Sequence, residues 1–190
     1  MWPGSQGRIR GFRRAAEILA HSMLSAADYR DMDTVVFPYL NCWRHYVELQ
    51  LKCLIGRCQR LLDQQIEPKH GHRLDTLWAD LGGLLDVTYP HKEPLDRSVV
   101  DRLLTQLAEL DPDNQEFRYA ERRNGAPTMA DVRHLDIDKV HTAMLGLANY
   151  LEAIESAIDH EEDIKQEAFE YEWEQRQQIE QEMRDDVGYE

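Results

Sequence analysis

The sequence of 190 residues has no long apolar run and few cysteines. Its purely apolar stretches are only a few residues long, far below the roughly 20 residues that a transmembrane helix needs. The first residues, which begin Met1-Trp2-Pro3, lack the apolar segment of a secretory signal. The three cysteines, Cys42, Cys53 and Cys58, lie in one predicted helix and match neither a disulfide framework nor a Cys-x-x-Cys metal site. We therefore expect a cytoplasmic protein without membrane association.

The common catalytic sequence motifs are also missing. There is no Gly-rich phosphate loop, no His-Glu-x-x-His helix and no Gly-x-Ser-x-Gly elbow anywhere in the chain. Their absence argues against the common nucleotide hydrolases, zinc proteases and esterases. No residue pattern predicts a bound metal, and none predicts a cofactor.

Positive charge is scarce and unevenly placed. The formal net charge is -14, yet residues 1–60 carry nine Lys or Arg against five Asp or Glu. Residues 161–190 carry three against twelve. A strongly acidic surface repels phosphates, so nucleic acid would have to bind at a local basic face. Arg8, Arg10, Arg13 and Arg14 supply such a face near the N-terminus.

Apolar residues recur at helical spacing along most of the chain. The pattern predicts an all-α protein, a single-domain helical bundle with helices near residues 9–27, 35–64, 74–87, 95–110 and 137–175. A polar loop is expected over residues 28–33, so that Pro38 falls in the first turn of the second helix. Residues 115–134 have no helical stripe, and Asn124-Gly125 predicts a turn in a short irregular or hairpin insertion.

One core should hold these helices together. Its predicted members are Leu19, Trp43, Val47, Leu51, Leu77, Leu103, Leu147 and Leu151. We expect the bundle to span residues 1–160, and residues 161–190 to form an acidic helical extension. Phe169 and Trp173 lie four residues apart in that extension and could anchor on a partner. The alternative is a solvated tail that keeps the protein soluble.

The second predicted helix carries an ordered set of polar side chains beside its apolar stripe. Arg44, Glu48 and Lys52 lie four residues apart, and His45 lies three before Glu48. Residues at these offsets are neighbours on a helix. The set is therefore either a salt-bridged ladder beside the core or a polar site on a rigid element. If Arg44 and His45 are catalytic, they should point into one polar cleft; if structural, internal hydrogen bonds should occupy them.

Three segments resemble the bacterial HEPN-like (higher eukaryotes and prokaryotes nucleotide-binding) family. Residues 37–52 are similar to the family's second helix, with a hydrophobic lead-in, Arg44-His45, and the Glu-Leu-Gln-Leu-Lys run of residues 48–52. Residues 71–78 resemble the Gly-His-x-Leu-x-x-Leu-Trp opening of its third helix, and Phe117-Arg118-Tyr119 resembles the Phe-Arg-Tyr that follows its fourth. With residues 11–19 at the start, the resemblance covers about residues 9–160.

This resemblance implies a helical bundle that is often dimeric. Many members of the family are metal-independent endoribonucleases of toxin-antitoxin or phage-defence systems. Active members carry an Arg-x4-6-His motif, typically near the start of the last core helix, whereas the match here is Arg14 to His21 on the first helix. In RNA cleavage, His can act as general acid or base while Arg holds the phosphate. The candidate catalytic residues are therefore Arg44, His45, Glu48, Arg14 and His21.

Two hypotheses for function follow from these patterns. The first is an RNA-directed component, an endoribonuclease, of a bacterial defence or toxin-antitoxin system. The second is a catalytically inactive helical interaction or scaffold module. In either case we expect a homodimer, or a partner protein held through the C-terminal helix. RNA is the expected ligand under the first hypothesis only.

Overall fold

The computed structural model describes residues 4–25, 29–66, 71–90, 97–122, 124–130, 132 and 134–187. They form five helices: α1 (Ser5–Ser25), α2 (Tyr29–Leu61), α3 (Leu74–Thr88), α4 (Ser98–Leu110) and α5 (Ile137–Val187). No β-strand occurs among these residues beyond one isolated bridge. The predicted all-α class is confirmed.

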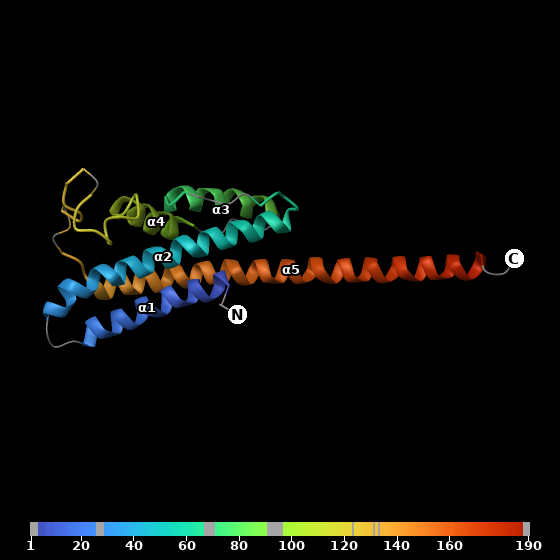
Figure 1. Ribbon diagram of the computed structural model, residues 1–190, viewed down its shortest axis with the longest axis horizontal. Helices are drawn as coiled ribbons and strands as arrows, with labels where there is room; N and C mark the ends of the chain where they lie inside the picture. The colour runs from blue at the N-terminus through green and yellow to red at the C-terminus, as the bar shows by residue number, and fades with distance from the viewer. Residues whose placement is uncertain are drawn as a thin grey trace.

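Helix α2 is the centre of the bundle. It contacts α1, α3 and α5, while α3 packs against α4. Figure 1 shows α3 and α4 together on one side of α2, with α1 on the other and α5 running alongside. Helices α1 and α5 are antiparallel, because Gln6 reaches Glu155 while Arg13 reaches the earlier Glu152. Both faces of α2 are therefore covered by other helices.

The core contains the residues that the apolar spacing predicted. Trp43, Val47 and Leu51 of α2 are almost completely buried, as are Leu147 and Leu151 of α5. Leu77 of α3 is buried as well, while Leu19 and Leu103 are partly buried and pack against the same cluster. Burying a side chain of this size contributes roughly 1.5–3 kcal/mol. Apolar contact across α2 therefore supplies the main attraction between the helices.

The predicted start of the second helix is wrong. We expected a loop over residues 28–33, but α2 begins at Tyr29 and contains Pro38 in its interior; Asp28 lies outside the described residues. An interior proline costs about 3 kcal/mol. The buried residues that follow it, from Tyr39 onward, hold the helix in place despite this cost. The proline therefore did not mark the first turn.

A turn-rich segment joins α4 to α5. Its tip is a turn in which the backbone N–H of Gly125 donates to the carbonyl of Arg122 (2.9 Å), and Gly125 has a φ of 78°. Glu121 and Pro127 form an isolated antiparallel bridge beside it. A left-handed φ favours glycine, so the predicted Asn124-Gly125 turn in a short irregular insertion is confirmed.

Helix α5 continues far beyond the bundle (Figure 1). It has 51 residues, which correspond to about 77 Å at 1.5 Å per residue. All residues from 163 to 184 are exposed, and we call this stretch the arm. The predicted end near residue 175 is too early, because Glu, Gln, Arg and Met favour helix even without packing. No helix in the described ranges has an apolar stretch long enough to cross a membrane.

Candidate functional site

The Arg44 guanidinium is completely buried between α2, the start of α3 and the end of α4. Its Nη1 donates to Glu48 Oε2 at 2.9 Å, and its Nη2 donates to the backbone carbonyl of His72. Its Nε lies 3.4 Å from Asp111 Oδ2. These contacts occupy the guanidinium inside the protein, where a substrate would have no access. Arg44 therefore connects three elements of the bundle, as the structural interpretation of this residue predicts.

The Glu48 side chain has three hydrogen-bonding partners. It accepts from Arg44, from Lys52 Nζ at 2.8 Å, and lies 2.8 Å from His72 Nδ1. Burial alone would raise the pKa of Glu48, but the hydrogen bonds from Lys52 and His72 and the charges of Lys52 and Arg44 together outweigh burial, and the pKa lies below the ordinary value. Glu48 is therefore a carboxylate at neutral pH. A proton-accepting role would compete with all three contacts.

His45 points to a different side of α2 from Arg44. Its ring lies against Phe12 of α1, with ring centroids 4.5 Å apart and planes tilted by 52°. Burial lowers the pKa of His45 below its ordinary value, so the neutral imidazole is favoured. In the described structure the two adjacent residues do not share a polar cleft. A catalytic role for the pair stays a prediction without support from their arrangement.

Arg14 and His21 lie on the solvent face of α1. Both are exposed, and Arg14 Nη1 is 3.6 Å from Glu17 Oε2. Their seven-residue separation places them about 10.5 Å apart along the helix axis on nearly the same face. The structure thus separates the five candidate residues into three places: Arg44 with Glu48, His45 on Phe12, and Arg14 with His21.

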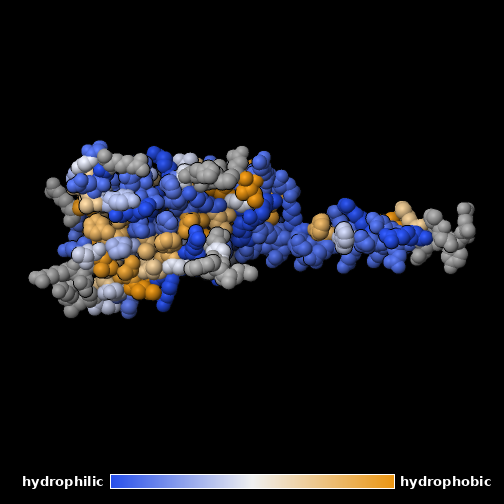
Figure 2. All heavy atoms as spheres, viewed as in Figure 1, coloured by the Kyte–Doolittle hydropathy of each residue, from blue (hydrophilic) through white to orange (hydrophobic). Residues whose placement is uncertain are grey.

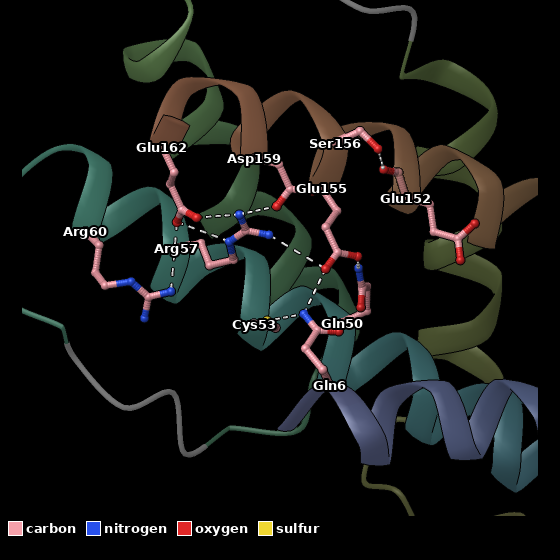
Figure 3. A network of polar contacts seen from close by, with 10 residues as sticks. All are labelled: Gln6, Gln50, Cys53, Arg57, Arg60, Glu152, Glu155, Ser156, Asp159 and Glu162. Atoms are coloured by element: carbon pink, nitrogen blue, oxygen red, sulfur yellow. Dashed lines mark hydrogen bonds and ion pairs between the residues drawn. The ribbon is translucent and has the colours of Figure 1, made fainter. Parts of the chain in front are cut away.

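A second charged network joins α2 to α5 (Figure 3). Arg57 Nη2 donates to Asp159 Oδ1 and to Glu162 Oε2, both at 2.5 Å, and Nη1 lies 3.7 Å from Glu155 Oε1. Hydrogen bonding to Glu162 raises the pKa of Arg57, and burial opposes this only in part. This network lies where the arm leaves the bundle.

Glu155 extends the same network to α1. It accepts from the side-chain amides of Gln6 and Gln50, each at 2.8 Å. This cluster was not among the sites predicted from the sequence. A usable signal was present, because Glu155, Asp159 and Glu162 are spaced four and three residues apart on one face of α5, and Arg57 lies on a helix predicted to pack nearby. The network holds three helices together.

The chemistry available at these clusters is limited. No group of three or more His, Cys, Asp or Glu side chains in the described ranges is arranged to hold a metal ion. A shallow pocket of about 400 Å³ lies beside His72 and is lined by Asp113, Arg118 and Tyr119 among others. It contains both acidic and basic side chains. A pocket with both signs of charge favours neither an anionic nor a cationic ligand.

The arm presents large apolar side chains to solvent. These are Ile164, Phe169, Tyr171, Trp173, Ile179 and Met183, each about half exposed or more. Figure 2 shows a few separate orange groups on an otherwise hydrophilic rod. Lys165 at its root donates to Asp63 Oδ1 at 2.6 Å and to the carbonyl of Leu61 at 3.1 Å, at the end of α2. Beyond that root, the described residues offer the arm no packing partner.

No family model, no curated protein and no solved structure matches this chain. The resemblance to the HEPN-like family therefore stays a prediction from the sequence motifs.

Proposed function

We propose that the chain is a helical interaction module that binds a partner protein through the arm. The observation that carries this proposal is the exposure of the arm, which is helical yet covered by none of the residues that the structure describes. A helix without tertiary contacts gains little stability from its apolar side chains. Large apolar side chains that lie together on one face of such a helix are typical of a surface that another protein covers.

The arrangement of these side chains supports the proposal. Phe169 follows the buried Ile158 by eleven residues, which is three turns with a deviation of about 20°. Phe169 and Trp173 therefore extend the stripe by which α5 packs into its own bundle. Tyr171 lies about 160–200° from each of them around the helix. A partner would meet Phe169 and Trp173 together, and would leave Tyr171 in solvent.

The experiment compares capture of partner proteins by variants of the immobilised full chain. Phe169→Ala/Trp173→Ala should weaken capture at least tenfold, because buried aromatic anchors contribute about 2 kcal/mol or more each at interfaces. A chain ending after Gln166 should lose the same proteins. This end point keeps the contacts of Glu162 and Lys165 with the bundle.

Tyr171→Ala is the matched control, since its side chain is 65% exposed, compared with 64% for Phe169 and 57% for Trp173. It should capture the same proteins as the unaltered chain. If all variants capture an identical set of proteins, the arm is not the binding element.

We propose RNA-directed activity as the second function, as in a bacterial defence or toxin-antitoxin system. The observation that favours it is the exposed basic face of α1, which carries Arg10, Arg14 and His21. An Arg and a His on one open face can hold a phosphate and transfer a proton. The buried Arg44 has no such access.

If this second function is right, the purified protein should cleave RNA in the presence of a chelator. His21→Ala should reduce the rate by about 100-fold or more, which is the usual contribution of general acid-base catalysis. Arg14→Ala should also reduce the rate, because the charge-assisted contact with the phosphate is lost. His160→Ala, at another exposed histidine, should leave the rate unchanged. Cleavage that persists in both α1 variants would remove this pair from the mechanism.

A further inference from the structure

The outer face of α1 combines basic and apolar side chains in one ridge. Arg10, Arg14, Ile18 and His21 follow each other at spacings of four, four and three residues, and all are exposed. Ile18 is 53% exposed. We call these four residues the α1 ridge. The opposite side of the helix, with Ile9, Ala16, Ala20 and Met23, is buried in the bundle.

The arm has the complementary combination. The arm contains seven Asp or Glu and three Lys or Arg. Glu170 and Glu174 lie directly beside Phe169 and Trp173 in a shallow surface groove. An acidic helix with apolar anchors fits a basic ridge with an apolar centre, both in sign of charge and in side-chain type.

From this complementarity we infer that the arm docks along the α1 ridge of a second copy of this chain. The inference rests on the proposed function, because it names the arm's partner and the surface that receives it. The arm cannot reach its own ridge, since α5 is one continuous helix that leads away from its bundle (Figure 1). Only the ridge of another copy is accessible to it.

The arm is long enough to cover the α1 ridge. The ridge runs from Arg10 to His21, or about 17 Å along the helix axis, and the 22 residues from 163 to 184 span about 33 Å. Because α1 and α5 are antiparallel within a chain, two copies facing each other would place each arm parallel to the partner's α1. Each copy then gives one arm and receives one. Such a reciprocal contact closes as a two-fold dimer and doubles the buried area.

The test is charge exchange followed by light scattering of the purified protein. The unaltered chain should have twice the 22.3 kDa mass of one chain at micromolar concentration. Arg10→Glu/Arg14→Glu and Glu170→Arg/Glu174→Arg should each be monomeric at that concentration, because each brings like charges together. An equimolar mixture of the two variants should recover the dimer mass, since opposite charges then face each other in both contacts.

Matched controls reverse charges elsewhere on the surface. Arg102 and Glu109 lie on the exposed side of α4. The substitutions Arg102→Glu and Glu109→Arg should therefore leave the dimer intact. Circular dichroism should show the same helix content in every variant. A dimer that survives both reversals, or a mixture that stays monomeric, overturns the pairing of arm and ridge.

The result also separates this inference from the proposed function. A monomeric unaltered chain that still captures another protein through Phe169 and Trp173 overturns the inference and keeps the proposed function. A monomeric chain whose capture does not depend on the arm overturns both.

Discussion

Arg44→Ala should lower the free energy of unfolding by about 3–5 kcal/mol, the usual result of removing one partner from a buried ion pair. The substitution leaves the completely buried Asp111 side chain without the guanidinium beside it and removes the hydrogen bond to the His72 carbonyl. It also removes one of three partners of Glu48. Urea unfolding monitored by circular dichroism at pH 7 measures the loss.

The pH of this measurement follows from Glu48. The pKa of Glu48 is lower in the folded protein than the ordinary value of 4.5. The ionised side chain therefore stabilises the fold fully above pH 4.5, and this stabilisation is lost as the pH falls through the lower pKa of the folded state. At pH 7 Glu48 is ionised in both states. The difference between the variants then reports the lost contacts, without a contribution from proton uptake at Glu48.

Lys52→Ala is the control for Arg44→Ala, because Lys52 also bonds to Glu48 but its side chain is 23% exposed. Water can reach Lys52 and take its place beside Glu48, so the control should lose less stability than Arg44→Ala, about 1.5 kcal/mol. An Arg44→Ala protein as stable as the control, but deficient in RNA cleavage, would instead identify Arg44 as a catalytic residue.

Arg57→Ala should destabilise the protein by about 2–3 kcal/mol, within the range of hydrogen bonds to charged groups. Arg57 is 8% exposed and neutralises three carboxylates, those of Glu155, Asp159 and Glu162. Without the guanidinium these acids repel one another along one face of α5. Their partial exposure to water keeps the cost below that of Arg44→Ala.

Two comparisons test this interpretation of Arg57. Arg60→Ala should lower the free energy of unfolding by less than about 0.5 kcal/mol. The Arg60 side chain is 56% exposed, and its distance of 4.0 Å from Glu162 is long for an ion pair. Raising the salt concentration should recover part of the loss in Arg57→Ala, since salt screens repulsion between carboxylates. An Arg57→Ala protein that unfolds at the same urea concentration as the Arg60 variant would contradict a structural role for the network.

The Arg57 network also helps to set the direction of the arm. Glu162 and Lys165 are the last residues of α5 that contact α2 or the turn after it among the described residues. They hold the helix at the point where it leaves the bundle, and so set the direction in which Phe169 and Trp173 are presented. Order at this root reduces the entropy that binding would otherwise cost.

Much of the fold was predictable from residue spacing. The apolar stripes through Trp43, Val47 and Leu51, and through Leu147 and Leu151, lie in the core as expected, because burial of one helix face imposes a 3.6-residue period on the sequence. The Asn124-Gly125 turn was predictable for a local reason, since glycine tolerates a positive φ. Helix ends were harder, as Tyr29 and Val187 show.

The candidate site was predictable only in part. The spacing of Arg44, Glu48 and Lys52 predicted that these side chains would meet, and they do. It could not reveal that Asp111 and His72, more than 20 residues away, would close over Arg44 and exclude solvent. The same limit hid the Arg57 network, whose acids come from a helix about 100 residues later in the chain.

The sequence by itself determined the all-helical class, the core stripes and the segregation of charge between α1 and the arm. These properties depend on residue type and on spacing within one helix, which the chain carries locally. Only the tertiary structure decided that Arg44 is enclosed, that His45 faces Phe12 and that the arm extends past every other helix. Each of these depends on which helices pack together and where each one ends, because burial is a property of neighbours distant in sequence.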